Sequence, residues 1–442
     1  MRAWWLALLV AAMAMCAVAC KGEPDKTPWC SAEEKGDAGP ILGAQAPTYF
    51  RDAKPIVDSK CIHCHVEGGI GPFPLTRWDD LFRRKHDIKR AIEKRHMPPW
   101  HAARCCAEYH DDTSLTDDEL ATFVRWLDDD APIGDARDAR EVKPIGGLSR
   151  VDFTAEIAEP FTPAPPPGTT DETRCFLLPW TLDRDAYVTG MNPVPGERSL
   201  VHHLFLGVLE GDSLDDARAL DGKDGRAGFD CTKLRGMGLG DLTVLGGSVI
   251  GGDYPGGLGK KVPAHSTLML NVHYSTASAP AKPDRTKIQF RVDDHAIDYR
   301  GMAIANLAWL VGEGMRIRAG EKDAVFFYAY EPTLFTRGKT VALRSVMPHM
   351  HAFASKIVVR IIKEDGRREC LLEIPHWHMG WQQPFWFKEP KRFDPGDKLY
   401  IECHFDNSAE NQPNGQAPRD IGWGDENQDM CAAFLSFTEG AP

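Results

Sequence analysis

The sequence lacks the features of a nucleic-acid-binding protein and those of a membrane-spanning protein. Its 52 Lys and Arg residues are outnumbered by 64 Asp and Glu residues, which gives a formal net charge of −12. Because no basic stripe is available for phosphate groups, a nucleic-acid partner is not expected. Beyond the first twenty residues no stretch reaches about 18 apolar residues, so we expect no transmembrane helix in the mature chain.

The composition is that of a globular protein with several domains. Hydrophobic residues make up 43% and charged residues 26% of the chain, which is typical of folded domains. A chain of 442 residues is too long for one ordinary core, and roughly three domains are expected. The 40 Gly and 32 Pro residues indicate many turns, which favours β-rich domains.

The first twenty residues have the pattern of an export signal. Arg2 precedes a short apolar run, and residues 17–20 resemble a bacterial lipoprotein box with Cys20 as the acylated residue. Because Ala17 stands where that box most often has Leu, simple cleavage after a small-residue site is the alternative. Lys21 stands where an inner-membrane retention Asp would be, which favours the outer membrane. We expect an exported protein of the bacterial cell envelope, facing the periplasm or cell surface, whose membrane contact is the lipid anchor.

Twelve cysteines in an exported chain indicate an oxidising compartment. Four have other assignments: Cys16 lies in the signal segment, Cys20 is the candidate lipidation site, and Cys61 and Cys64 belong to the motif described next. Eight remain, an even number, but their connectivity cannot be read from the sequence.

A polar linker over about residues 21–45 leads to CIHCH at residues 61–65, the attachment pattern of a c-type haem. Cys61 and Cys64 would bind the vinyl groups as thioethers, and His65 would be the proximal iron ligand. A thioredoxin-like redox pair has no use for the trailing histidine. A zinc site would need a second ligand pair, and the adjacent cysteines at 105–106 have the wrong spacing.

The sixth haem ligand is expected from RHMPPWH at residues 95–101, and we assign it to Met97. The two prolines make a stiff, extended segment able to carry a thioether to the iron. Met97 as core filler, with His96 as the ligand, is the alternative. This layout resembles small class I cytochromes c and implies an all-α haem domain over residues 46–140.

A helix after the Met97 segment supports this domain. Thr116 with Glu119 three residues later forms a capping box. Downstream of this cap, four apolar residues fall on one face at helical spacing. They are Leu120, Phe123, Val124 and Leu127.

From about residue 150 the sequence consists of short apolar runs separated by Gly, Pro and Asp. KEDG at residues 363–366, between two such runs, predicts a hairpin. About 290 residues with this pattern are enough for two antiparallel β-sandwiches of the jelly-roll type.

Histidines of ligand type stand inside these predicted strands. His202 and His203 are adjacent in SLVHHLFLG at residues 199–207, although neighbours in a regular strand point to opposite faces. His273 lies in a second strand, and a single buried histidine is more often structural than a ligand. His376, His378 and His404 are interpreted as structural or surface residues.

A second ligand set stands near the C-terminus. His349 and His351 are two residues apart, which places both rings on one face of a strand. Imidazole suits copper and zinc, and the thioether of Met430 favours Cu(I). Alone, Met430 would be read as core filler.

The motifs VHHLFLG, LNVHYS, PHMH and DMC follow one another in the order found in the copper type II, ascorbate-dependent monooxygenases, which the chain resembles over most of residues 155–440. That family includes peptidylglycine α-hydroxylating and dopamine β-monooxygenases. The resemblance implies two copper domains, 150–308 and 309–442, two copper ions, a bulged or kinked His-His strand, and a Cys403–Cys431 disulfide. The implied ligands are His202, His203 and His273 for one copper, and His349, His351 and Met430 for the copper that binds O2. Within the first copper domain, Cys175 and Cys231 are a candidate bridge.

Two further observations restrict the function. A blue-copper site beginning at Cys403 is excluded, because no histidine follows His404 in the chain. Met347, Ala432 and Phe434 stand where the peptide-hydroxylating member has substrate anchors, and they cannot make comparable hydrogen bonds. Peptidylglycine is therefore not the expected substrate. Trp377, Trp381 and Trp386 are expected either to line an apolar pocket or to fill the sandwich core.

The sequence thus predicts a copper monooxygenase that uses O2 to hydroxylate a C–H bond of a small substrate. The metal ligands carry this chemistry without a protein acid or base. A fused c-type haem would pass electrons to the two coppers from ascorbate or a periplasmic redox protein. The alternative is an exported haem and copper protein that transfers electrons and has no substrate.

Overall fold

A computed structural model of the chain describes residues 45–442, apart from 68, 70, 235–241, 248–250, 278, 311–313, 380, 413–415 and 425–427. The side chains of 202, 242–247, 307 and 310 are also outside the description. The predicted signal segment with Cys20, and the linker up to residue 44, lie outside the described residues. Among the described residues, no helix is long and apolar enough to cross a membrane.

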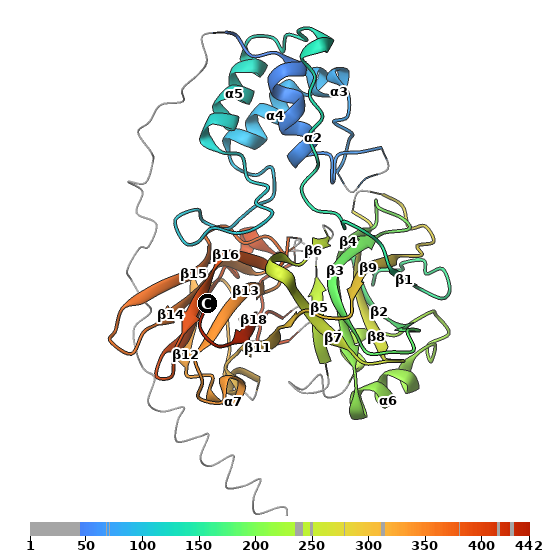
Figure 1. Ribbon diagram of the computed structural model, residues 1–442, viewed down its shortest axis with the longest axis vertical. Coiled ribbons are helices and arrows are strands. Elements are labelled where there is room, and N and C mark those ends of the chain that lie inside the picture. The colour runs from blue at the N-terminus through green and yellow to red at the C-terminus, as the bar shows by residue number, and fades with distance from the viewer. Residues whose placement is uncertain are drawn as a thin grey trace, which may run out of the picture.

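The described residues from 45 to 138 form a helical unit at one end of the molecule (Figure 1). Its core contains Leu81, Phe123, Trp126 and Leu127. Its elements are η1 (Tyr49–Ala53), α2 (Lys54–Lys60), α3 (Trp78–Arg83), α4 (Lys85–Glu93), α5 (Asp117–Asp128) and η2 (Ala136–Asp138).

The predicted capping box begins α5. The Thr116 hydroxyl accepts a hydrogen bond from the amide of Glu119 (3.1 Å), and the Glu119 carboxylate accepts one from the amide of Thr116 (2.8 Å). The apolar face that follows is buried at Phe123 and Leu127 and partly buried at its other two positions. The predicted helix is confirmed, whereas the haem remains a proposal.

Two sheets pack together as a first β-sandwich around a core that includes Leu178, Leu206, Leu270 and Phe290. One sheet has the order β1-β9-β3-β7-β10, with β6 beside β3, and the other has the order β2-β8-β4-β5. The pairing is antiparallel except that β10 pairs with β7 in parallel over two residues, which corrects the purely antiparallel expectation. The bounds are β1 (Phe153–Glu156), β2 (Asp171–Pro179), β3 (Ala186–Val194), β4 (Val201–Leu209), α6 (Gly211–Leu220), η3 (Cys231–Lys233), β5 (Leu242–Gly247), β6 (Gly252–Asp253), η4 (Pro255–Gly257), β7 (Leu258–Val262), β8 (Thr267–Ser275), β9 (Lys287–Asp293) and β10 (Ile297–Asp298).

A second β-sandwich lies beside the first (Figure 1), and its four-stranded sheets have the orders β11-β18-β13-β16 and β12-β17-β14-β15. The predicted hairpin is present, because β14 and β15 pair as antiparallel neighbours. Strand β11 pairs with β18, so the second sandwich begins before the expected residue 309. The bounds are β11 (Arg300–Ile304), η5 (Leu307–Leu310), β12 (Ala324–Tyr330), α7 (Thr333–Thr336), β13 (Val341–His349), β14 (Ala354–Ile362), β15 (Arg368–Ile374), β16 (Phe385–Phe393), β17 (Lys398–Phe405), η6 (Ala409–Asn411) and β18 (Ala432–Glu439).

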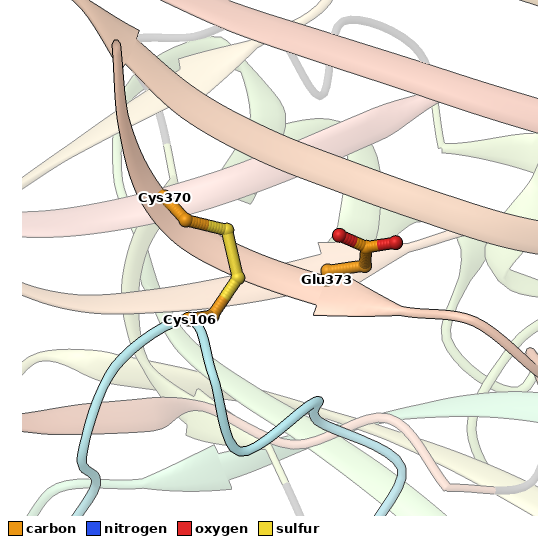
Figure 2. Close-up of side chains that lie close together, drawn as sticks. All are labelled: Cys106, Cys370 and Glu373. Atoms are coloured by element: carbon orange, nitrogen blue, oxygen red, sulfur yellow. A yellow bond between two sulfur atoms is a disulfide. The ribbon is translucent and has the colours of Figure 1, made fainter. Parts of the chain in front are cut away.

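Residues 98–111, which we call the docking loop, belong to the predicted haem domain but pack on the second sandwich. Its Cys106 forms a disulfide with Cys370 in β15 (Figure 2). Tyr109 is 3% exposed within the core of that sandwich, and its hydroxyl donates to the carbonyl of Leu371 (2.7 Å). Glu373 lies beside the two sulfur atoms. Because those sulfur atoms are bonded to each other, they are not thiolates that could ligate a metal.

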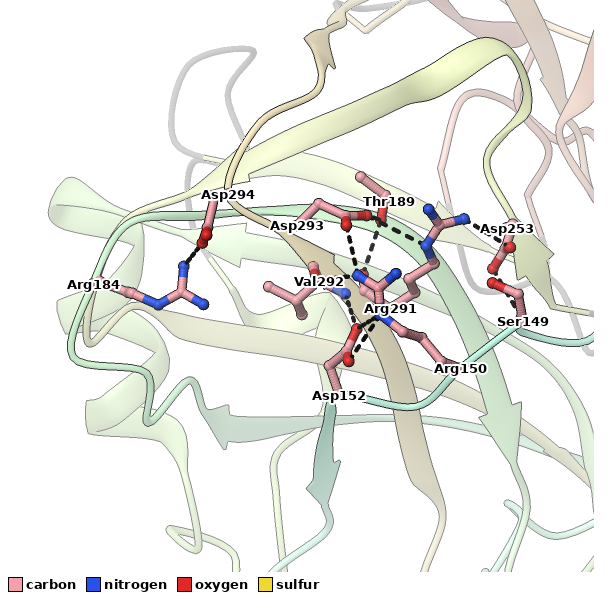
Figure 3. A network of polar contacts seen from close by, with 10 residues as sticks. All are labelled: Ser149, Arg150, Asp152, Arg184, Thr189, Asp253, Arg291, Val292, Asp293 and Asp294. Atoms are coloured by element: carbon pink, nitrogen blue, oxygen red, sulfur yellow. Dashed lines mark hydrogen bonds and ion pairs between the residues drawn. The ribbon is translucent and has the colours of Figure 1, made fainter.

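The segment that leaves the helical unit reaches the first sandwich through a network of polar contacts (Figure 3). Arg150 pairs with Asp152 (2.9 Å) and with Asp293 at the end of β9 (2.5 Å). The amide of Ser149 donates to Asp253 (3.2 Å), which also pairs with Arg291 (2.8 Å). The helical unit is therefore connected to both sandwiches, to one by the docking loop and to the other by this network.

Arg174 in β2 provides a test of the first sandwich. It is 2% exposed and donates to the Asp224 carboxylate (2.6 and 2.8 Å) and to the carbonyls of Ala227, Arg226 and Gly228. Arg174→Met should lower the free energy of unfolding in urea by about 2–3 kcal/mol, because buried carbonyls lose their donors.

The matched control is Arg184→Met, which removes an exposed ion pair with Asp294 (Figure 3). It should leave the free energy of unfolding nearly unchanged. Equal effects of the two substitutions would contradict the role assigned to Arg174.

Candidate metal centres

The first candidate centre lies where β4 pairs with β8. Val201 is opposite Tyr274 and His203 is opposite His273, and the register shifts between these two pairs. One residue, His202, is therefore left over in β4, so the strand has the bulge that the family resemblance implies. A bulge interrupts the alternation of side chains, which is what two adjacent histidines need in order to reach one ion. The side chain of His202 lies outside the description.

Two ring nitrogens face each other at this centre. His203 Nδ1 and His273 Nδ1 are 3.3 Å apart, and the rings are nearly perpendicular with centroids 4.6 Å apart. Ligands bound at about 2 Å to one tetrahedral ion are separated by about 3.3 Å. These residues therefore fit a copper or zinc ion, since imidazole suits both.

Asp171 at the start of β2 orients His273, which is 4% exposed. Its carboxylate accepts a hydrogen bond from His273 Nε2 (3.0 Å), so the lone pair of His273 is left on Nδ1, facing His203. Burial acts to raise the pKa of Asp171, but the hydrogen bond from His273 and those from neighbouring hydroxyls hold it at about 2. The sequence prediction missed Asp171, because only the pairing of β2 with β8 brings it to the histidine.

The second candidate centre begins at the end of β13. The rings of His349 and His351 have centroids 5.1 Å apart and are perpendicular. His349 Nδ1 donates to the Gln382 side-chain oxygen (2.8 Å), while the Gln382 amide nitrogen donates to the carbonyls of Met350 and Met379 (3.3 and 3.1 Å). This network fixes the orientation of the His349 ring and makes Nε2 the candidate ligand atom.

His351 has a buried Nδ1 with no hydrogen-bond partner. Burial, followed by the neighbouring His349, lowers its pKa to about 3, so the ring is neutral at physiological pH. A buried polar atom without a partner is costly, and a metal ion would satisfy it. The donor set at the second centre therefore also fits copper.

Asp429 connects the two chain segments of the second centre. It is fully buried, and its carboxylate accepts hydrogen bonds from the amides of His351 (2.6 Å), Phe353 (2.9 Å) and Met430 (2.8 Å). Burial raises its pKa to about 7, against the effect of these donors. The Cys403–Cys431 disulfide that the resemblance implies is present immediately after Met430.

The two centres lie on elements that meet between the sandwiches. The Phe434 ring on β18 is 6.2 Å from that of His349 and 6.3 Å from that of Phe205 on β4. The charge of His273 is the smallest of the influences that lower the pKa of His351, which places the two centres near each other. Sequence reasoning could not find this proximity, because it depends on how the sandwiches pack.

The CIHCH motif follows the C-terminal end of α2. Cys61 and Cys64 are free and partly buried, whereas the other described cysteines are disulfide-bonded. His65 Nδ1 donates to the carbonyl of Phe73 (2.9 Å), which leaves Nε2 to ligate a metal. Two free thiols beside an oriented imidazole fit covalent haem. Met97 is partly buried in the segment between α4 and the docking loop.

The remaining residues singled out by the sequence have structural contacts. The Trp386 ring packs against those of Tyr254 and Tyr299 (5.5 and 5.7 Å between centroids), which favours the packing interpretation over a pocket. The Trp377 indole donates to the carbonyl of His351 (3.1 Å). The candidate Cys175–Cys231 bridge is formed.

Comparison with known proteins finds a similarity in the C-terminal part of the chain. Residues 329–441 match the model of the copper type II ascorbate-dependent monooxygenase family, C-terminal domain. The matched range includes β13, the second candidate centre and the adjacent disulfide. The match supports copper-dependent monooxygenase activity, an oxidoreductase chemistry that uses O2 and a reductant.

No curated protein matches the chain. Among solved structures, a putative secreted protein from Parabacteroides distasonis aligns with this chain at 8% sequence identity and a TM-score of 0.16. The alignment spans 66% of this chain and 99% of the other. A likeness at this level supports no inference about fold or function.

Asp171→Asn should weaken copper binding at the first centre by about 10- to 100-fold, because an amide no longer fixes the orientation of His273. Copper titration against a competing chelator measures the affinity. Asp185→Asn, at an exposed carboxylate paired with Lys261 (2.8 Å), is the matched control. An unchanged affinity in Asp171→Asn would show that this carboxylate does not orient the ligand.

Asp429→Asn should lower the free energy of unfolding by about 2–3 kcal/mol, because an amide nitrogen then faces backbone N–H donors. Urea unfolding of the copper-free protein measures this change. Asp420→Asn, at an exposed carboxylate that also accepts from a backbone amide (2.8 Å), should shift the transition far less. Similar shifts for both variants would refute the connecting role of Asp429.

Proposed function

We propose that the chain is a copper-dependent monooxygenase that hydroxylates a C–H bond of a small substrate with O2. The observation that carries this proposal is the buried, unpartnered His351 Nδ1 beside the oriented His349, within the region that matches the monooxygenase domain. Bound copper would supply the two electrons that allow one oxygen atom to enter the substrate while the other leaves as water.

The protein side chains hold and orient the metal ligands. One copper would be held by His202, His203 and His273, with Asp171 fixing the last of these (3.0 Å). The copper that meets O2 would be held by a second set, with Gln382 fixing one of its imidazoles (2.8 Å). That set is His349, His351 and Met430. These supporting hydrogen bonds exist without the metal, so the orientations of His273 and His349 are pre-organised.

A haem attached to Cys61 and Cys64, with His65 and Met97 as axial ligands, would supply electrons one at a time. The free thiols and the His65–Phe73 hydrogen bond support this assignment. The docking loop supports the relay itself, because it runs from the Met97 segment onto the second sandwich and is bonded there through Cys106. Ascorbate or a periplasmic redox protein would be the electron donor.

The contacts near the second centre favour a small, largely apolar substrate. Met347 is 8% exposed, and Phe434 packs between Phe205 and His349. Neither offers a hydrogen-bond donor for a carboxylate. The disulfides Cys106–Cys370, Cys175–Cys231 and Cys403–Cys431 fit an exported protein, and we propose Cys20 as its lipid anchor.

The test combines copper stoichiometry with haem oxidation. Wild-type protein should bind about two coppers per haem and His349→Ala about one. With copper and O2 present, chemically reduced haem should reoxidise rapidly in the wild type and at least about tenfold more slowly in His349→Ala. His295→Ala, at an exposed histidine, should match the wild type in both measurements.

Three outcomes would separate the parts of the proposal. Wild-type protein that binds no copper would show that the histidine strands are structural. Copper binding without haem reoxidation would refute the relay. Copper binding with O2 consumption, but without a hydroxylated product from any supplied substrate class, would favour an electron-transfer protein.

A further inference from the structure

The disulfide between the docking loop and the second sandwich is more exposed than the bridges inside the sandwiches. Cys106 is partly exposed, and it is bonded to Cys370, which is 3% exposed. Exposed disulfides are the ones that thiols reach and reduce. The bridges inside the sandwiches are buried at both ends, and they are Cys175–Cys231 and Cys403–Cys431. The Cys106–Cys370 bridge is therefore the candidate for reversible chemistry.

The Glu373 side chain in β15 lies beside this bridge (Figure 2). One of its carboxylate oxygens is within 4.8 Å of both sulfur atoms. Glu373 is 8% exposed; its Oε1 pairs with Lys356 (2.9 Å), whereas its Oε2 is buried and has no hydrogen-bond partner. A buried acceptor without a donor is costly. The closed bridge cannot supply a donor, because the two bonded sulfur atoms carry no hydrogen.

Reduction of the bridge would supply the missing donor. A cysteine thiol can donate through its S–H group, and a carboxylate acceptor makes such a hydrogen bond stronger. Because the buried Oε2 of Glu373 would have a partner only in the reduced form, its presence stabilises that form relative to the disulfide. Glu373 therefore favours opening of the bridge.

We propose that Cys106–Cys370 is a redox-sensitive latch, which a dithiol opens and whose reduced form Glu373 stabilises. A thiolate of the dithiol attacks the sulfur atom of Cys106, the S–S bond breaks, and Cys370 leaves as a thiolate that takes up a proton. The second thiol of the dithiol then displaces Cys106. The dithiol is oxidised to a disulfide, and its two hydrogen atoms end on the two cysteines.

Opening of the latch would leave only noncovalent contacts between the docking loop and the second sandwich. Close to the bridge, the amide of Ala103 donates to the carbonyl of Glu373 (2.7 Å), and the Tyr109 hydroxyl donates to the carbonyl of Leu371 (2.7 Å). Arg104 lies in the same part of the loop and is exposed, so trypsin can report on release of the loop. The latch connects the helical unit to the sandwich whether or not the chain is a monooxygenase.

The test uses the full-length protein in buffers with graded ratios of reduced to oxidised dithiothreitol. After equilibration, acid stops the exchange, free thiols are alkylated, and mass spectrometry identifies the modified peptides. In the wild type, Cys370 should be alkylated at a ratio at least about tenfold lower than Cys175 or Cys403. Reduction of Cys370 only together with the buried bridges would overturn the proposal.

Glu373→Gln keeps the side-chain volume but replaces the carboxylate acceptor by an amide. Reduction of Cys370 in this variant should require a ratio about tenfold higher than in the wild type. The matched control is Glu108→Gln, at an exposed carboxylate of the docking loop that pairs with Lys388 (3.5 Å), and it should behave as the wild type does. Equal ratios for Glu373→Gln and the wild type would also overturn the proposal.

Limited trypsin digestion tests release of the loop. Wild-type protein reduced at Cys370 and alkylated should be cut after Arg104 at least about tenfold faster than the oxidised protein. A double variant, Cys106→Ala with Cys370→Ala, should be cut at one rate with or without this treatment. An unchanged cleavage rate in the reduced wild type would show that the bridge is not a latch.

Discussion

The alternation of side chains along a β-strand is the constraint on which both candidate centres depend. Two imidazoles can share an ion only if they reach the same side of a sheet. The chain meets this requirement in two ways. In β4 the register shift between Val201 and His203 interrupts the alternation, whereas at the end of β13 one intervening residue separates His349 from His351. The adjacent pair needs a distorted strand, whereas His351 lies beyond the last residue of β13, where its amide donates to Asp429.

Hydrogen bonds to one nitrogen of an imidazole ring decide which nitrogen can bind a metal ion. Asp171 accepts a hydrogen bond from Nε2 of His273, whose Nδ1 faces His203. Gln382 accepts one from Nδ1 of His349. Asp429 acts on the backbone and joins the segment of His351 to that of Met430. These three residues come from separate parts of the chain, so contacts between distant segments position the candidate ligands His273, His349 and His351.

The arrangement of the three units suggests why a helical unit precedes two sandwiches. The docking loop belongs to the helical unit by sequence, but it packs into the core of the second sandwich. Ala102 and Tyr109 are buried there together with residues of the sandwich strands. Contacts of Phe434 then join the second sandwich to β4 of the first. The proposed electron carrier in the helical unit would therefore be connected by a disulfide to the sandwich that contains the second candidate centre.

The sequence by itself determined the β-rich character of the units that follow about residue 150, the α5 helix with its capping box, and the β14–β15 hairpin, and it supplied the motifs of the candidate ligand sets. These features are local, because caps, turns and strand periodicity depend on residues a few positions apart. The pairing of Cys403 with Cys431 was implied by family resemblance and is present. Only the tertiary structure decided that Asp171, Gln382 and Asp429 contact the candidate ligands or their backbone, that β11 belongs to the second sandwich, and that Cys106 pairs with Cys370. Each of these depends on contacts between distant segments, which arise from sheet pairing and packing and have no signature in neighbouring residues.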